Sequence, residues 1–495
     1  MSGIRVTYTG LIAFVIALIT VFASMIFNLI VTRTLTPMEY GTWGLMNGFL
    51  TYAVVIEPVI GYWVAREIAR KVESGKTAVI SSGVLSTTGI VIFIISAFFV
   101  SREAELDLNV ILLALVLIPP RFVNGTLAAI NQSWKPHTIS YGIIALGITQ
   151  IPMALMFVYY FEWGISGLIL SVFTGLVVSN IILGWFAKEK ISVDFSFEHL
   201  KKWIKLFWLP LYLAIPGMIY RLDVVIFTVL TGSVIGLAFW TASIAISTIV
   251  SHSGLIARAI YPKMLMGEGD SFLKSNFTQF FYFAIPLTTL VIIFARPALF
   301  TLNPEYEDAY LVLVFLSLQV FFTTLGGVIE LTLLGKDEVD IDKKSKFKDY
   351  LKSRLFGMPT LEMIQHTIYM ILLIIGLVIL APNSSIIELI VYWSILSMAV
   401  RIPFTIYRYG LLRKSVKINF ESKSIAKYLL SSIIVFGATF FMTEEFLVYN
   451  ERIFAFLPNF LLFVIIGIVG YLVITYLIDN RTRNLIYAVL KEIKK

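Results

Sequence analysis

The feature that most constrains this chain is a series of fourteen nearly charge-free apolar runs, separated by short polar segments. A helix needs about 20 apolar residues to cross a bilayer, and backbone polar groups in lipid must bond within the segment. We therefore predict an all-α, polytopic membrane protein with about 14 transmembrane helices. The predicted spans are 10–32, 42–64, 78–100, 109–131, 138–160, 164–186, 207–230, 234–257, 277–299, 309–334, 361–381, 386–406, 428–443 and 456–478. We expect the pair Pro119-Pro120 to break the fourth span.

The composition agrees with this reading, because 58% of the residues are hydrophobic and only 14% are charged. Soluble proteins are about 45–50% apolar and about 25% charged. Of the 39 Lys and Arg residues, 32 fall in the segments that share a side with the N-terminus, and only Arg33, Arg102, Arg296 and Arg452 belong to the opposite side. The positive-inside rule then predicts that both termini of this multi-pass protein are on the cytoplasmic side of the cell membrane.

The lack of cysteine and the small number of histidines disfavour several kinds of site. The chain contains no cysteine, and its four histidines are far apart in sequence, so we predict no metal site. No phosphate-binding G-x-x-x-x-G-K-[ST] loop is present, and we predict no cofactor and no ATP hydrolysis. The net charge of +8 follows from the cytoplasmic loops, so a nucleic-acid partner is not expected.

Three polar segments carry amphipathic patterns at the predicted cytoplasmic face. Segment 187–206 places Phe197, Leu200, Ile204 and Phe207 on one helical face beside lysines, which is typical of an interfacial helix. The charged loop 335–360 and the basic tail 479–495 have the same pattern. We expect all three to lie against membrane lipids.

An internal repeat relates the two halves of the chain. Residues 35–41 and 230–236 are both Leu-Thr-x4-Gly at the turn of a helical hairpin. At the other end of each hairpin, Ala-Arg-x-Ile-x-x-Lys recurs at 65–71 and 257–263. Both hairpins begin on the same side, so the repeat is parallel. We predict two parallel six-helix lobes around a central cavity, plus two C-terminal helices.

The predicted organisation follows from that repeat. The parts are an N-terminal lobe (1–186), a cytoplasmic amphipathic linker helix (187–206), a C-terminal lobe with the charged loop (207–427), helices 13–14 (428–478) and a basic cytoplasmic tail (479–495). This architecture is typical of transporters that work by alternating access.

Four segments together resemble the Wzx-type polysaccharide flippases of the MOP (multidrug/oligosaccharidyl-lipid/polysaccharide) exporter superfamily. The segments are RTLTPMEYG at 33–41, GYWVAREIAR at 61–70, the region from Asp223 through Gly232 and Gly236 to Tyr261-Pro262-Lys263, and PALFTLNPEYEDA at 297–309. The resemblance covers residues 1–335 and weakens beyond them. It implies a flippase that moves a polyprenyl- or dolichyl-(pyro)phosphate-linked oligosaccharide across the cytoplasmic membrane for polysaccharide or glycoprotein biosynthesis.

Ionisable residues within predicted spans are candidates for the site, because placing one in the bilayer costs about 2.5–3.5 kcal/mol. We predict that Arg121 and Arg221, with Arg66 and Arg258 at the inner rim, form a cationic path that binds the phosphate of the substrate. Glu57 lies at a depth similar to that of Arg121 and is a candidate ion-pair partner.

Glu57 and Asp223 are also candidates for coupling transport to a proton or sodium ion. Arg221 and Asp223, two residues apart, should face different directions. Each of these residues also has a purely structural interpretation, as an ion pair or as an ordinary cytoplasmic charge.

Two alternatives remain open. An ion-coupled multidrug or metabolite antiporter of the MATE type would share the architecture but usually has twelve spans. A membrane glycosyltransferase or polymerase would need long catalytic loops outside the membrane, and the predicted outer loops are short. We therefore expect the protein not to be an enzyme.

Overall fold

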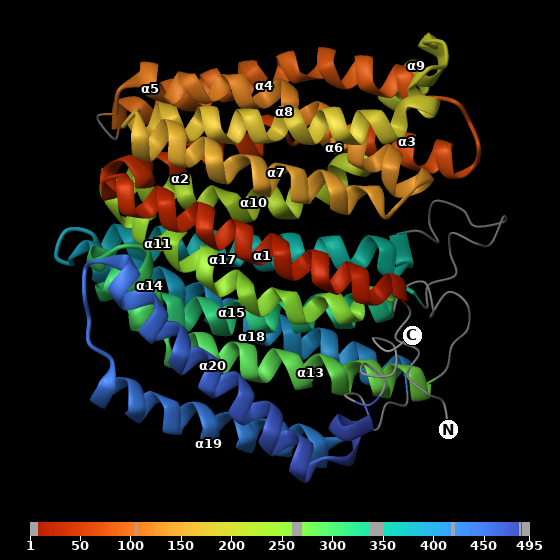
Figure 1. Cartoon of the computed structure of the whole chain (residues 1–495). Helices are drawn as coiled ribbons and strands as arrows, with labels where there is room; N and C mark the ends of the chain where they lie inside the picture. The colour runs from red at the N-terminus through yellow and green to blue at the C-terminus, as the bar shows by residue number, and fades with distance from the viewer. Residues whose placement is uncertain are drawn as a thin grey trace. The chain divides into compact units, whose positions relative to one another are not determined.

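The computed structural model describes residues 8–103, 106–259, 270–335, 351–416, 421–484 and 487. All its regular elements in these ranges are helical (Figure 1). The first half comprises α1 (Tyr8–Thr34), α2 (Pro37–Ala53), α3 (Glu57–Ala69), α4 (Gly75–Glu103), α5 (Leu108–Leu112), the 3-10 helix η1 (Leu113–Leu117), α6 (Ile118–Trp134), α7 (Thr138–Ala154), the π-helix η2 (Leu155–Tyr160), α8 (Gly164–Ile191) and α9 (Phe197–Lys205).

The second half comprises α10 (Trp208–Thr231), α11 (Ile235–Ser247), the 3-10 helix η3 (Thr248–Ala259), α13 (Asp270–Ile293), α14 (Ala295–Leu302), the 3-10 helix η4 (Pro304–Ala309), α15 (Tyr310–Leu334), α17 (Arg354–Leu380), α18 (Ile386–Ser415), α19 (Ser422–Phe446) and α20 (Ile453–Ile478).

The predicted multi-pass architecture is confirmed. Among the described residues, 12 helical runs are long and apolar enough to cross a membrane, and α2 with α3 makes a thirteenth that is bent by 54°. Helix α1 supplies a further apolar stretch over Thr20–Thr34. Every predicted span therefore overlaps one or more of these helices. We call the predicted cytoplasmic ends of these helices the inner ends.

The thirteenth predicted span is shorter than the helix that contains it. The thirteenth was expected over 428–443, whereas α19 covers Ser422–Phe446. Charged residues near both ends, such as Lys427 and Glu444, lie within this helix. The span was predicted from a run of residues without charge, so the prediction ended at those charged side chains. The hydrogen-bonded backbone of the helix continues past them.

The helices form two compact units. The N-terminal unit contains Thr9–Thr241 and Met370–Ser384, and the C-terminal unit contains Ala242–Tyr369 and Ser385–Lys495. Helix α10 belongs to the N-terminal unit by this division. The predicted lobe boundary at 187–206 rests on the sequence repeat rather than on compactness, and it stays a prediction.

The two repeated Leu-Thr words lie at equivalent helix–helix turns. Thr36 caps α2 in a reciprocal capping box with Glu39. In the second copy Gly232 ends α10 in the left-handed conformation, with φ of 63°, which glycine adopts at little cost. The superposition of the complete halves remains a prediction.

In the N-terminal unit, α6 packs between α3, α4 and α8 (Figure 1). The expected break in the fourth span is confirmed, because Pro119 and Pro120 occupy the first turn of α6 and follow the 3-10 helix η1. The Pro120 carbonyl accepts a hydrogen bond of 2.9 Å from the Asn180 amide of α8. Such bonds matter in lipid, where an unsatisfied backbone group costs several kcal/mol.

The linker helix α9 is fastened to the inner ends of α3 and α4. Trp203 is fully buried in a cluster with Ile68 and Ala78. The buried Glu67 carboxylate of α3 lies 3.3 Å from the Lys202 ammonium and 3.2 Å from the His199 ring. The linker is therefore an integral part of the N-terminal unit.

The predicted helix in the linker is confirmed, but its faces differ from the prediction. Leu200, expected to share a lipid-facing side with Phe197 and Ile204, instead packs on the protein beside Trp203. Phe197 and Ile204 are exposed. Trp203 was missed because it lies among lysines. Most of the charged loop 335–360 and of the tail 479–495 lies outside the described residues.

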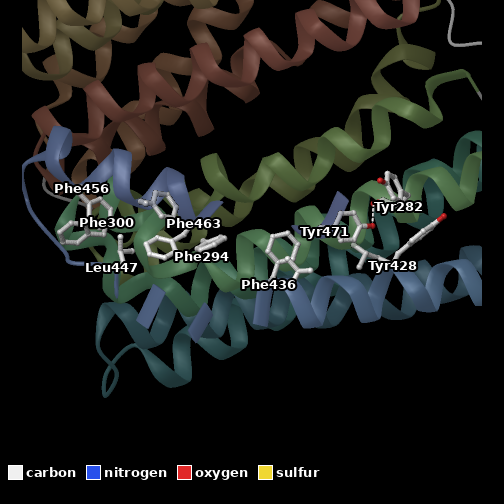
Figure 2. Packing of buried hydrophobic residues seen from close by; sticks show 12 residues of the cluster. Tyr282, Phe294, Phe300, Tyr428, Phe436, Leu447, Phe456, Phe463 and Tyr471 are labelled. Carbon is white, nitrogen blue, oxygen red and sulfur yellow. Dashed lines mark hydrogen bonds between the residues drawn. The ribbon is translucent and has the colours of Figure 1, made fainter. Parts of the chain in front are cut away.

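In the C-terminal unit, the hairpin α19–α20 packs on α13 and α14 through an aromatic cluster (Figure 2). Phe300, Phe456 and Phe463 lie toward one end of this cluster, and Tyr282, Tyr428 and Tyr471 toward the other. The Tyr471 hydroxyl donates a 2.9 Å hydrogen bond to the Tyr282 carbonyl. The cluster joins the last two helices to the rest of the unit.

Candidate functional site

A break in the second span places Glu57 inside the N-terminal unit. Helix α2 ends at Ala53 and α3 begins at Glu57. Pro58 explains the break, because its ring lacks an N–H donor and would clash with the Val54 carbonyl of a continuous helix. Glu57 therefore occupies the first turn of α3, where the positive end of the helix dipole favours an acidic side chain.

Two glycines make room for the Glu57 carboxyl group. A Cβ at Gly125 of α6 would lie 2.5 Å from Oε1 of Glu57, and a Cβ at Gly61 would lie 3.1 Å from it. Oε1 is buried and has no hydrogen-bond partner among the described residues. The carboxyl group thus lies between two helices without a compensating charge.

Arg121 lies one helical turn from Gly125 on α6 and bonds to a neutral group. Its guanidinium donates a hydrogen bond of 3.2 Å to the Asn47 side-chain oxygen on α2. The ion pair between Arg121 and Glu57, considered from their similar depth, is not formed in the described part of the chain. The depth of two residues along their helices does not determine the direction of either side chain. Here the Arg121 side chain points toward Asn47 of α2.

Arg221 and Asp223 lie on α10, which packs against α2. Arg221 is exposed, whereas Asp223 is only 2% exposed and accepts a 2.8 Å hydrogen bond from the Val224 backbone. The expectation that the two side chains face different directions is confirmed. The Tyr52 hydroxyl of α2 donates a 3.1 Å hydrogen bond to the Met218 carbonyl and lies within electrostatic range of both charged groups.

Of the two arginines predicted at the inner rim, the structure describes the side chain of Arg66 and only the backbone of Arg258. Arg66, near the end of α3, is exposed and lies over the Tyr62 ring, 4.4 Å from its centroid. The backbone of Arg258 is in η3, but its side chain lies outside the described part of the structure. Arg121, Arg221 and Arg66 all belong to the N-terminal unit. Among the described residues, Asn47 is the hydrogen-bond partner of the Arg121 guanidinium.

A buried charged cluster in the C-terminal unit contains residues that were not among the candidates predicted from the sequence. Arg408 of α18 is 1% exposed, and its guanidinium lies 3.0 Å from Glu362 of α17 and 3.8 Å from Glu330 of α15. Glu362 and Arg408 lie at or beyond the ends of the predicted spans 361–381 and 386–406. A search for charge-free runs therefore could not predict that these two residues are in contact inside the protein.

A second arginine continues this polar contact between α17 and α18. The buried Arg401 guanidinium lies 3.5 Å from the His366 ring. With the Gln365 amide turned to satisfy both groups, its oxygen accepts bonds of 3.0 and 3.1 Å from Arg401. Arg401 thus contacts Gln365 and His366, and Arg408 contacts two carboxylates.

Comparisons with known proteins give a fold but no sequence family. No family model and no curated protein matches the chain. The lipid II flippase MurJ, in an inward closed conformation, is similar with a TM-score of 0.63 and 15% identity over 96% of this chain and 100% of that one.

Two conformations of a MATE-family multidrug resistance transporter of the MOP superfamily are also similar. The inward-facing one has a TM-score of 0.56 and 13% identity over 80% of this chain and 95% of its own. The outward-facing one has a TM-score of 0.52 and 14% identity over 81% of this chain and 96% of its own. The chain is therefore a multi-pass membrane protein with the fold of MOP superfamily transporters.

Proposed function

We propose that this protein is a flippase, which moves an oligosaccharide linked to a polyprenyl or dolichyl (pyro)phosphate across the cytoplasmic membrane by alternating access. The observation that carries the proposal is the environment of Arg121. This half-buried arginine bonds to neutral Asn47 rather than to Glu57. Its positive charge therefore remains available to an anionic headgroup.

The chemistry of Arg121 suits a phosphate. A guanidinium is planar, remains charged, and binds two phosphate oxygens at once. Arg221 on α10 and Arg66 at the inner end of α3 are exposed, and in this proposal they continue the cationic path from Arg121. Arg258 is also proposed to belong to this cationic path, because it occupies the position equivalent to Arg66 in the sequence repeat. The sugar and phosphate would follow these residues, while the lipid tail stays in the bilayer.

The close contact of α2 with α10, α11 and the turn between them supports alternating access. Gly41, Gly44 and Gly48 form a glycine seam on one face of α2. Cβ atoms at these positions would lie 2.0 Å from the Val234 oxygen, 2.7 Å from the Thr241 hydroxyl and 3.3 Å from a Val224 methyl. Helices joined by flat glycine surfaces separate without withdrawing interlocked side chains.

The extent of the structural similarity favours a flippase over the alternative of an ion-coupled MATE-type antiporter. The MurJ comparison extends over 96% of this chain, whereas the MATE comparisons extend over 80% and 81%. An uncompensated arginine also disfavours cationic cargo. The similar structures are transporters and a flippase, which supports the expectation that the protein is not an enzyme. Both termini are proposed to be cytoplasmic.

The experiment compares glycan transport by Arg121→Gln, Arg121→Lys and the wild type in proteoliposomes that contain a fluorescent polyprenyl-diphosphate oligosaccharide. We expect Arg121→Gln to lower the flipping rate at least tenfold and Arg121→Lys to retain part of it. Arg452→Gln, at an exposed site before α20, is the matched control and should transport normally. Normal flipping by Arg121→Gln would contradict the proposal.

A further inference from the structure

The Glu57 carboxyl group has the surroundings of a proton-binding site. It is enclosed by the faces of Gly61 and Gly125, and its Oε1 is buried without a partner in the described residues. An ionised carboxylate in such surroundings costs several kcal/mol, whereas the protonated group costs much less. This arrangement therefore favours the protonated form of the Glu57 carboxyl group over the ionised form.

Few charges face Glu57 from the packed helices. Helix α6 presents Arg121, and α10 presents Arg221 and Asp223. Between Glu39 and Glu57 on the α2 side, and between Lys76 and Arg102 of α4, the sequence contains no ionisable Asp, Glu, His, Lys or Arg. The remaining neighbour, α9, directs His199 and Lys202 to Glu67 instead. Arg121, four residues from Gly125 on α6, has no carboxylate partner among the described residues.

Arg121 can exchange partners without moving its helix. Gly125, against which the Glu57 carboxyl lies, is four residues from Arg121 on α6. Positions four apart on a helix have Cβ atoms about 5–6 Å apart, which is within the span of an arginine side chain. An ionised Glu57 would offer Arg121 the attraction of an opposite charge in addition to a hydrogen bond, which the neutral Asn47 amide lacks, and would therefore draw the guanidinium away from Asn47.

We propose that a proton on Glu57 decides which partner Arg121 holds. With the proton present, Arg121 bonds to Asn47 and keeps a free positive charge. When Glu57 releases the proton to water, the guanidinium turns to the carboxylate and its charge is neutralised. The inference rests on the proposed function in one respect: it makes anion binding at Arg121 depend on protonation of Glu57, and so couples the cargo to a proton.

The test measures the proton on Glu57 directly. Dicyclohexylcarbodiimide modifies protonated carboxyl groups in apolar surroundings, and mass spectrometry quantifies the adduct on the Glu57 peptide. The purified full chain is labelled at pH 7 in lipid nanodiscs without any glycolipid. We expect wild type to be modified, and Asn47→Ala, which releases Arg121 to Glu57, to be modified at least tenfold less.

Two further variants keep the result interpretable. Arg121→Gln added to Asn47→Ala removes the competing cation, and modification should return to within twofold of wild type. Asn47→Asp retains Arg121 at its present position and should also match wild type. Equal labelling of Asn47→Ala and wild type, failure of the double variant to recover, or loss of labelling in Asn47→Asp would each overturn the switch. Because no glycolipid is present, these outcomes are independent of the flippase assay.

Discussion

Gly41 of α2 lies so close to Val234 that a Cβ added to the glycine would be 2.0 Å from the Val234 carbonyl oxygen. No side chain fits at that distance without moving one of the two backbones. The two residues come from the two copies of the repeated Leu-Thr-x4-Gly word. The repeat therefore brings one copy against the other within the N-terminal unit.

The first prediction follows from this contact. Gly41→Ala should destabilise the protein by about 1–3 kcal/mol, the usual cost of overpacking. The measurement is the thermal unfolding midpoint in detergent. Gly83→Ala on α4 is the control, because nothing lies within 4 Å of the added Cβ. There the substitution should be neutral or stabilising, since alanine is the better helix former. Equal midpoints for the two variants would contradict the close contact.

The second prediction concerns orientation in the membrane. The chain has no cysteine, so single cysteines report accessibility without background. Cysteines at the exposed positions Glu305 and Asn383 should react with an impermeant maleimide added to intact cells. Cysteines at Lys201 and Ser422, which are equally exposed, should react only after the membrane is opened. The reverse pattern would refute the cytoplasmic placement of the termini.

The third prediction tests the charged cluster around Arg408. Arg408→Met leaves Glu362 and Glu330 without their shared cation, and loss of one member of a buried pair costs about 3–5 kcal/mol. Adding Glu362→Gln should recover part of the lost stability, as measured by the unfolding midpoint. Arg413→Met, at an exposed position of the same helix, should have little effect. Additive losses in the double variant would show that the pair is not coupled.

The fourth prediction concerns acid stability at the inner end of the C-terminal hairpin. Burial alone raises the pKa of the Asp479 carboxyl, but hydrogen bonds from Tyr428 and Thr482 and the nearby Lys427 ammonium hold the pKa below its ordinary value of 3.8. A carboxyl whose pKa is lower in the folded protein stabilises it above the unfolded pKa. That contribution is lost as the pH falls below 3.8 through the folded pKa.

The measurement for this prediction is the unfolding midpoint between pH 6 and about pH 3. Wild type should lose stability at the acid end, and Asp479→Asn should be less stable at pH 6 with a smaller further loss in acid. Parallel pH profiles for the two proteins would show that Asp479 does not contribute in this way.

The spans could be predicted from sequence because membrane insertion depends on a one-dimensional quantity, the length of an apolar run. The direction of each side chain around its helix is a different quantity, and it depends on which neighbour the helix packs against. This is why Arg121 could be assigned a depth but not its partner. Asn47 attracted no notice because it is uncharged. Arg408 was missed because its carboxylate partners on α15 and α17 are brought to it only by tertiary packing.

The attachment of the α19–α20 hairpin has a directional consequence in a bilayer. Lipid tails surround aromatic rings such as Phe300 and Phe456 about as favourably as protein does, so contacts of that kind hold two helices together only weakly. The hydrogen bonds from Tyr471 to α13 and around Asp479 have no substitute in lipid. The hairpin is thus firmly attached toward its inner end. Toward the phenylalanine-rich end, lipid can replace the contacts that the hairpin makes with α13 and α14.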